Sequence, residues 1–119
     1  MNKFSVLIPF RNEKEEVGRT VKSVRETAGD KVDIIVVNDS SYDGYDYEKD
    51  LEPYNVNYCI TSERLGSSAG KELCVELCST PYFIILDAHC RMHTPNWLEL
   101  AEELMERPES KNTVYCCTC

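Results

Sequence analysis

The sequence predicts an α/β fold of three layers, in which helices cover both faces of a mostly parallel sheet. Three observations support this prediction. Short runs rich in Val and Ile alternate with amphipathic segments of helical period, a pattern typical of a parallel sheet with right-handed crossovers. Two of these runs end in clusters of polar residues, as expected where strands meet a ligand crevice. The 119 residues contain no repeat or linker, so we expect a single domain spanning residues 1–119.

The first half of the chain predicts a strand, a helix and a second strand. An apolar run from Ser5 to Ile8 predicts the first strand, which Pro9 is expected to end because proline cannot donate to a central ladder. Asn12 is expected to cap the helix that follows, with Glu15 as its capping-box partner. The buried stripe of this helix is expected to be Val17, Val21, Val24 and Ala28. Val32 to Val37 then predicts the second strand.

The middle of the chain gives weaker signals. Asp46 to Tyr54 suggests a short irregular helix, and Asn57 to Thr61 suggests a short third strand. A second long helix is expected from Ser68 onward. This helix has to stop before Pro81, because the residue before a proline is pushed out of the helical region.

The last third of the chain predicts a strand, a helix and a final strand. The nearly continuous apolar run from Tyr82 to Leu86 predicts a central strand covered on both faces. Thr94 as N-cap and Pro95 at the first helical position mark the start of the last helix. Trp97 has the spacing of a core anchor rather than of a stacking platform. Thr113 to Cys117 is expected to form the final strand.

Composition excludes several classes of function. Lys and Arg number 13 against 21 Asp and Glu, and the net charge of −8 argues against a nucleic-acid partner, which needs clustered cations. No apolar run approaches the roughly 20 residues that span a bilayer, and the first residues do not have the pattern of a signal peptide. We therefore expect no membrane span and a cytoplasmic location.

The seven cysteines are read as reduced thiols rather than as a disulfide framework, because their number is odd. Four of them fall inside expected elements, namely Cys59, Cys74, Cys78 and Cys90. The terminal group of Cys116, Cys117 and Cys119 invites a zinc site. No second pair of cysteines completes a four-ligand set at familiar spacing, so structural zinc is the less favoured interpretation.

Asp87 and His89 directly follow the apolar run that ends at Leu86. In extended geometry, residues two apart share a face, so a carboxylate oxygen and an imidazole nitrogen placed this way can hold one divalent cation. The other coordination positions would stay open to a phosphate-bearing ligand. The alternative is structural, since an Asp at a strand end is often a turn former and a lone His often makes a structural hydrogen bond.

Two other loops carry polar residues that are expected near the same crevice. Asn38 to Gly44 has the composition of a turn, yet Asp39 follows a buried strand and its carboxylate can accept from a base N–H. The stretch from Gly66 onward resembles a phosphate-binding loop only in part, because Glu72 stands where a magnesium-binding hydroxyl is required. This loop can still place backbone N–H groups and Lys71 near an anion. A flexible entry to a helix is the alternative.

Taken together, four segments resemble the nucleotide-sugar glycosyltransferases of the GT-A fold, in the same order along the chain. These segments are Ser5 to Glu13, Val36 to Gly44, the Gly66 loop and Leu86 to Cys90. The last of them, together with Asn96 to Glu99, is similar to the polypeptide N-acetylgalactosaminyltransferases, and the opening strands are similar to the family 2 transferases. The resemblance covers the chain but only the donor-binding half of such an enzyme, without its acceptor subdomain.

The resemblance implies a minimal GT-A fold and a role for individual residues. The residues that it implies in nucleotide binding are Pro9, Phe10, Arg11, Glu13, Asp39, Gly66, Lys71 and Ala88. The acidic residue that recognises uracil in the family matches Asp39, whereas the usual Asp-Asp pair is Asn38-Asp39 here. Asp87 and His89 match the D-x-H form of the metal motif.

The implied function is a metal-dependent glycosyltransferase domain that binds a UDP-sugar donor, with transfer or slow hydrolysis of the sugar. Mn²⁺ is preferred over Mg²⁺ because imidazole matches a small, hard, oxygen-preferring ion poorly. No residue is implied as a catalytic base or a third metal ligand. The alternatives are a non-catalytic nucleotide-sugar binding module, a truncated donor half, a homodimer that completes the site, and a doubly wound interaction domain.

Overall fold

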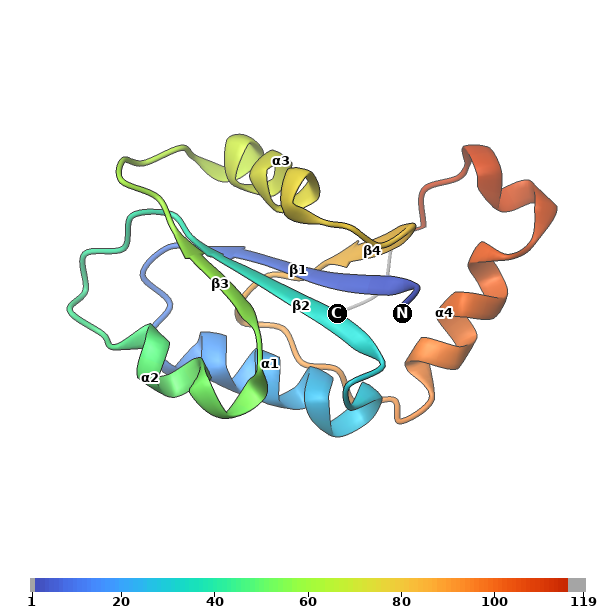
Figure 1. Cartoon of the computed structure of the whole chain (residues 1–119), viewed down its shortest axis with the longest axis horizontal. Coiled ribbons are helices and arrows are strands. Elements are labelled where there is room, and N and C mark those ends of the chain that lie inside the picture. Colours follow the sequence, from blue (N-terminus) through green and yellow to red (C-terminus); the bar gives the residue numbers. More distant parts are fainter. Residues whose placement is uncertain (1, 116–119) are drawn as a thin grey trace.

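The computed structural model describes residues 2–115, whose core is a four-stranded sheet in the order β3-β2-β1-β4. The strands are β1 (Phe4–Phe10), β2 (Val32–Asn38), β3 (Asn57–Ile60) and β4 (Tyr82–Ile85). Every pairing is parallel. The carboxyl ends of the strands therefore lie at one edge of the sheet (Figure 1).

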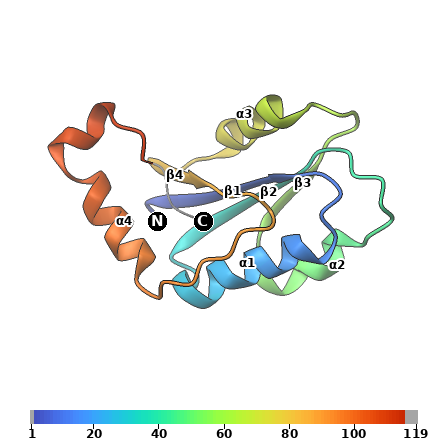
Figure 2. The same cartoon turned by 180° about the vertical axis from the view of Figure 1, so that it is seen from behind.

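Helices α1 (Glu15–Ala28) and α3 (Ser67–Leu77) cover opposite faces of this sheet, as Figures 1 and 2 show from two sides. The expected three-layer α/β fold is thus confirmed. The other helical segments are α2 (Tyr47–Leu51), η1 (Glu52–Tyr54), α4 (Trp97–Met105) and η2 (Pro108–Asn112). Within the described residues, no helix is long and apolar enough to cross a membrane.

Two apolar cores lie on the two faces of the sheet because successive strand residues point to opposite sides. Val6, Ile8 and Val36 pack with α1 in the larger core. Leu7 and Ile35 pack with α3 in the smaller one. The expected stripe of α1 is confirmed, since each of its members is buried: Val17, Val21, Val24 and Ala28.

The expectation that β4 is a central strand is wrong. Among the described residues it pairs only with β1 and forms one edge of the sheet. Phe83 and Ile85 are 43% and 36% exposed. An apolar run tells how hydrophobic a strand is but not which neighbours it has, and here the central positions belong to β1 and β2.

Pro9 does not end the first strand, which continues to Phe10. The pairing explains how β1 tolerates a proline. The Leu86 N–H donates to the Leu7 oxygen, so odd residues of β1 present their polar backbone groups toward β4. β4 pairs with β1 only over Phe4 to Leu7, and the missing N–H of Pro9 therefore faces a side where the ladder has already stopped.

The end of the chain also differs from expectation. Thr113 to Tyr115 form no strand, and the remaining two residues of the expected strand lie outside the described part of the chain. The last long helix begins at Trp97 with Asn96 rather than Thr94 as its N-cap. Trp97 is a core anchor as expected, because it is buried and its Nε1–H donates to the Thr27 hydroxyl at 2.8 Å.

Three of the cysteines expected to be reduced are free thiols in the structure: Cys59, Cys74 and Cys78. Cys74 is buried against the smaller core, and this burial raises the pKa of its thiol to about 11. The zinc interpretation concerned Cys116, Cys117 and Cys119, which lie outside the described residues.

Candidate functional site

The carboxyl edge of the sheet brings together the loops that follow β1, β2, β3 and β4 (Figure 1). Parallel pairing forces these loops to one side although they are far apart in the sequence. In open α/β sheets this edge is where ligands bind.

Asp39 is the buried acidic residue of this edge, with an exposed fraction of 6%. Its Oδ1 accepts from the Leu65 N–H at 2.7 Å and from the Thr61 hydroxyl at 3.2 Å, and its Oδ2 accepts from the Gly66 N–H at 2.9 Å. Burial pushes the pKa of Asp39 upward, but these hydrogen bonds and nearby Arg11 outweigh it and lower the pKa below its usual value. Asp39 is therefore an ionised residue that shapes the entry to α3.

Asn12 joins two loops instead of capping α1, so the predicted capping box is wrong. Lys14 occupies the N-cap position of α1 and makes no side-chain cap bond. The Asn12 N–H donates to the Ser41 hydroxyl at 2.9 Å, and the Asn12 Oδ1 accepts from the Tyr42 N–H at 2.9 Å. Asn12 has a φ of 54°, a left-handed conformation that asparagine tolerates better than most residues. The Asn12 side chain thus bonds to the polar loop after β2 instead of to the first turn of α1.

Arg11 lies beside this junction, with its guanidinium carbon 4.7 Å from the centroid of the Tyr42 ring. Its Nε is a buried donor without a hydrogen-bond partner in the described part of the chain. A buried unpaired donor costs free energy unless something else accepts from it. The neighbouring Phe10 is buried and packs against Tyr47, with ring centroids 4.7 Å apart. Phe10 therefore has a packing role at the end of β1.

Tyr47 is a residue of this edge that sequence reasoning did not single out. Its hydroxyl donates to Asp43 Oδ2 and accepts from the Lys14 N–H at 2.8 Å. Burial, together with the bond to Asp43, raises the pKa of Tyr47 to about 12. Only its position in a run rich in aromatic and acidic residues gave a signal, and such runs are usually solvated loops.

Asp87 and His89 lie in a turn, not in an extended segment as expected. The strand stops at Ile85, and the Cys90 N–H donates to the Asp87 oxygen at 3.1 Å. The two side chains still approach each other, with Asp87 Oδ2 and His89 Nε2 3.9 Å apart. They are 63% and 57% exposed. The other ring nitrogen of His89 lies 3.4 Å from Glu13 Oε2, so His89 stands between two carboxylates.

The donor set of Asp87 and His89 suits a divalent cation, because it combines a carboxylate oxygen and an imidazole nitrogen that are both open to solvent. Within residues 2–115, however, no group of three or more His, Cys, Asp or Glu side chains is arranged to hold a metal ion. A cation held here would therefore have two protein ligands and would take its other ligands from water or a bound anion.

The turn that carries Asp87 and His89 rests on α1. Thr20, fully buried in the middle of this helix, places its hydroxyl 2.5 Å from the Ala88 oxygen and 2.6 Å from the Cys90 oxygen. Arg91 donates to the same hydroxyl at 2.9 Å and to Glu16 at 3.0 Å. Sequence reasoning missed Thr20, whose only signal was a hydroxyl next to the apolar stripe of a helix.

Of the remaining predicted residues, Gly66, Lys71 and Pro9 lie at or near the start of α3, whereas Ala88 packs on the α1 side of the sheet. Gly66 has a φ of 90°, which favours glycine, and its N–H is the one that reaches Asp39. Lys71 is exposed one turn into α3, whereas Ala88 is buried in the turn after β4. Pro9 is half-buried next to Gly70, where an added Cβ would lie 3.7 Å from the Pro9 Cβ.

Comparison with known proteins identifies this arrangement. The family model described as "Glycosyl transferase family 2" matches residues 5–118. The chain belongs to glycosyl transferase family 2. A curated relative, the teichoic acid poly(glycerol phosphate) polymerase of Staphylococcus epidermidis, is 27% identical over 97 residues, which are 74% of this chain and 13% of that protein.

Solved structures show that this family 2 chain has the GT-A fold. The mannosyltransferase PcManGT of Pyrobaculum calidifontis, in complex with GDP-Man and Mn²⁺, superposes with a TM-score of 0.77 at 18% identity, over 89% of this chain and 33% of that one. S. aureus TarS 1-349 in complex with UDP gives 0.75 at 18% identity, over 87% and 32%. The same protein in complex with UDP-GlcNAc gives 0.73 at 18% identity, over 87% and 31%. The chain thus spans about a third of these structures and less of the curated relative.

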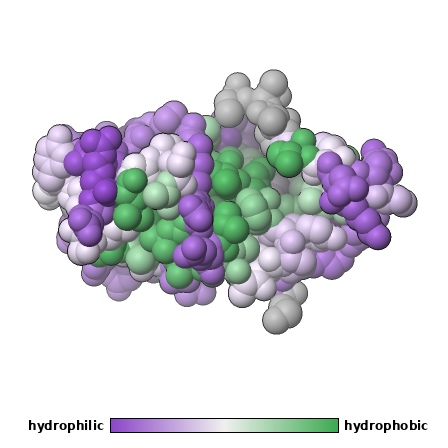
Figure 3. Space-filling model, turned by 90° about the horizontal axis from the view of Figure 1, so that it is seen from above, coloured by the Kyte–Doolittle hydropathy of each residue, from purple (hydrophilic) through white to green (hydrophobic). Residues whose placement is uncertain are grey.

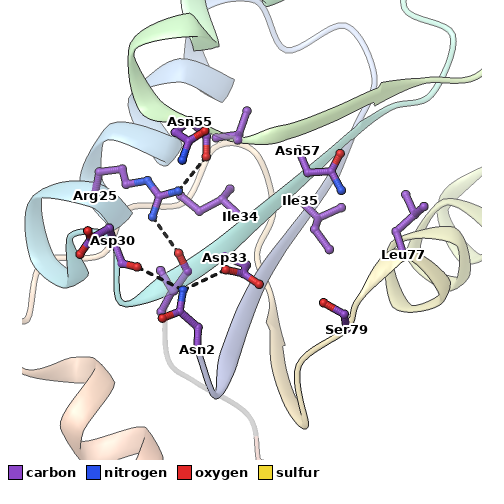
Figure 4. Close-up of a pocket in the computed structure, with 12 residues that line it drawn as sticks. Asn2, Arg25, Asp30, Asp33, Ile34, Ile35, Asn55, Asn57, Leu77 and Ser79 are labelled. Atoms are coloured by element: carbon purple, nitrogen blue, oxygen red, sulfur yellow. Dashed lines mark hydrogen bonds between the residues drawn. The ribbon is translucent and has the colours of Figure 1, made fainter.

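A separate cavity of about 390 Å³ lies at the opposite end of the sheet of this family 2 domain, near the amino ends of β2 and β3 (Figure 4). Arg25 reaches into its wall. Four of the five N–H groups of the Arg25 guanidinium donate to backbone oxygens, those of Tyr54, Gly29, Val32 and Asn55. Because these bonds only close the ends of neighbouring segments, we place the site at the carboxyl edge instead.

Proposed function

We propose that this family 2 domain binds a UDP-sugar at the carboxyl edge of its sheet and acts as the donor-binding part of a glycosyltransferase. The observation that carries the proposal is the pair of Asp87 and His89, 3.9 Å apart at the same edge as the ionised Asp39. Family membership and the nucleotide or nucleotide-sugar complexes of the structural neighbours support it.

Asp39 is proposed to recognise the uracil base. Its Oδ2 accepts one hydrogen bond in the structure, from Gly66, and a carboxylate oxygen can accept a second. The ring N–H of uracil could donate this second hydrogen bond. Pro9, Glu13 and the guanidinium of Arg11 are proposed to frame the nucleotide, while buried Phe10 supports their loop from below.

Two donors at this edge suit the anionic part of the ligand. The Nε of Arg11, which has no hydrogen-bond partner among residues 2–115, needs an acceptor. Lys71 is exposed on the first turns of α3, and helix starts with free N–H groups attract anions. In a chain of net charge −8, these groups need help to hold a diphosphate.

Asp87 and His89 are proposed to supply that help by holding Mn²⁺, with Mg²⁺ the less favoured ion. A divalent cation bound there would stabilise the negative charge of a departing nucleoside diphosphate as a Lewis acid. Asp87 and His89 would orient the ion, and Glu13 would keep the imidazole in place through the other ring nitrogen.

Calorimetry of UDP binding with and without Mn²⁺ tests this proposal. We expect measurable binding that depends on Mn²⁺ in the wild type and at least a tenfold loss in Asp87→Ala, since loss of one of two protein ligands removes much of the ion's hold. Glu99→Ala is the matched control, because Glu99 is an exposed carboxylate on α4, a helix at the opposite end of the sheet from the carboxyl edge (Figure 1). Equal UDP affinity in Asp87→Ala and wild type would remove the metal from the proposal.

The same protein is proposed to release UDP slowly from a UDP-sugar in the presence of Mn²⁺, by transfer or hydrolysis. General-base catalysis contributes typically 10²- to 10⁴-fold, and no residue of this chain is assigned that role, so turnover should be slow. UDP release from a panel of UDP-sugars, measured beside Asp87→Ala, distinguishes this from a non-catalytic binding module. Binding without any Mn²⁺-dependent release would favour the module.

A further inference from the structure

The exposed side chains of Asp87 and His89 have little packing of their own, since they are 63% and 57% exposed. Their separation therefore depends on the backbone of the turn that carries them. One hydrogen bond closes this turn internally, from the Cys90 N–H to the Asp87 oxygen at 3.1 Å. A single such bond leaves the carbonyl groups of the turn to find donors elsewhere.

One donor comes from α1. The Thr20 hydroxyl lies 2.5 Å from the Ala88 oxygen and 2.6 Å from the Cys90 oxygen, and these two residues flank His89. Because a hydroxyl has a single hydrogen, Thr20 shares it between the two oxygens. Arg91 adds a second donor, since its guanidinium donates to the Thr20 hydroxyl and to the Cys90 oxygen, each at 2.9 Å. One buried hydroxyl thus contacts a carbonyl on either side of His89, and Ala88 lies between Asp87 and His89 in the chain.

The other contact of His89 comes from the loop before this helix, because Glu13 lies 3.4 Å from His89 and two residues before the start of α1. A displacement of the turn relative to α1 would change the distance from His89 to Glu13. Buried Ser23 of α1 also contacts the segment that follows the turn, since its hydroxyl accepts from the Met92 N–H at 2.9 Å.

We propose that Thr20 is a positioning residue for the cation site, which it holds in place through the carbonyl groups of Ala88 and Cys90. The inference rests on the proposed function, because it concerns the Asp87 and His89 pair of that site. Residues behind the ligands of a metal typically change its affinity by 10- to 100-fold when they are mutated. Thr20 acts from behind the turn and touches no ligand itself.

Titration with Mn²⁺ alone, followed by electron paramagnetic resonance, tests the role of Thr20. Thr20→Val removes the hydroxyl at nearly constant volume, and we expect it to weaken Mn²⁺ binding by about tenfold or more. Thr20→Ser restores the hydroxyl and should bind Mn²⁺ close to the wild-type affinity. Rescue by serine separates the hydroxyl from the packing of the threonine methyl group.

The matched control is Thr27→Val, which makes the same change two turns along α1. Its hydroxyl accepts from Trp97 at 2.8 Å and anchors α4 rather than the turn. We expect Thr27→Val to lower the melting temperature but to leave Mn²⁺ affinity unchanged. An equal loss of affinity in Thr27→Val and Thr20→Val would show a general effect of stability and would overturn the proposal.

Asp87→Ala distinguishes failure of this inference from failure of the proposed function. If Asp87→Ala binds Mn²⁺ as the wild type does, the proposed cation site is wrong and the inference falls with it. If Asp87→Ala loses binding while folded Thr20→Val keeps it, the site stands and Thr20 has no positioning role. Should Thr20→Val not fold, Arg91→Met removes the donor that holds the Thr20 hydroxyl, and unchanged Mn²⁺ affinity in that folded variant overturns the inference.

Discussion

At the scale of single residues, Asp39 illustrates how one carboxylate can hold the start of a neighbouring segment. Its oxygens accept from the backbone N–H groups of Leu65 and Gly66, which start the segment leading into α3. Because these bonds need the charged form, its pKa is lowered. The neighbouring Asn38 does related work without charge, accepting from the Ser41 N–H and donating to the Tyr58 hydroxyl.

Replacing Asp39 by Asn should lower the free energy of unfolding by about 1.5 to 3 kcal/mol at neutral pH, because the amide nitrogen cannot accept from a backbone N–H. It should also weaken UDP more than Mn²⁺. The wild-type contribution is present above the unfolded pKa of about 3.9 and is lost as the pH falls through the lower folded value. Urea denaturation between pH 7 and pH 3 measures this.

The control for Asp39 is Asp30→Asn, an exposed change that should stay within about 0.5 kcal/mol of the wild type. If the difference in free energy of unfolding between Asp39→Asn and the wild type does not decrease in acid, the charge of Asp39 is not the cause of the stabilisation. Equal affinity for UDP in both proteins would exclude Asp39 from base recognition.

At the scale of elements, the short helix α2 and the start of α1 are held together by Tyr47. The Tyr47 hydroxyl accepts a hydrogen bond from the N–H of Lys14, the N-cap residue of α1. Lys14 makes no side-chain cap bond itself. Its ring packs on Phe10 at the end of β1. One side chain of α2 therefore connects the end of a central strand with the beginning of the helix that carries Thr20.

This connection predicts a loss of stability at high pH. The pKa of Tyr47 is raised to about 12, so the unfolded chain, with a tyrosine pKa of about 10, loses this proton first. The contribution of Tyr47 is fully present below pH 10 and should be lost between about pH 10 and pH 12. Tyr47→Phe should cost about 1 to 3 kcal/mol at pH 7, because the Lys14 N–H loses its acceptor.

Thermal unfolding of wild type and Tyr47→Phe at pH 7, 10 and 11.5 measures the effect. The two proteins should converge in stability as the pH rises. Tyr42→Phe is the control, since Tyr42 is 75% exposed. A constant gap between wild type and Tyr47→Phe over this range would contradict the prediction.

At the scale of the whole molecule, the two faces of the sheet are covered unequally. The α1 face is buried under α1, α2 and parts of α4. On the other face, α3 covers β1 and β2 but leaves Phe83 and Ile85 of β4 partly open. Figure 3 looks onto this side and shows apolar surface there between more polar regions. Val75 and Leu77 of α3 are also exposed large apolar residues.

This apolar surface should bind the dye ANS in the folded state, because ANS binds to exposed apolar surface. Phe83→Ser should reduce the fluorescence of bound ANS by about half or more, since Phe83 is a large exposed apolar side chain of β4. Leu100→Ser is the control, because Leu100 is more exposed, at 52%, and lies on α4. Equal effects of both changes would mean that the dye does not report on β4.

Local patterns in the sequence were enough to predict the layers of the fold and the polar residues at the ends of the strands. They placed α1 and its buried valine stripe correctly, because burial of one helix face repeats every three to four residues. They also predicted strands at β1 and β2 and located the polar clusters at Asp39 and Asp87. These features depend on neighbours in the chain and are therefore visible in it.

The tertiary structure was needed to show which strand lies at an edge, which side chain caps which loop, and what holds the turn from Asp87 to Cys90. β4 resembles a central strand in composition, but pairing depends on segments far away in the sequence. The Asn12 side chain accepts a hydrogen bond from the loop after β2 instead of capping α1. The Thr20 hydroxyl contacts the carbonyl of Ala88, which is 68 positions away in the sequence. Local sequence patterns do not predict such long-range contacts. The same threonine can bond to water or to a buried carbonyl, and its residue type does not show which.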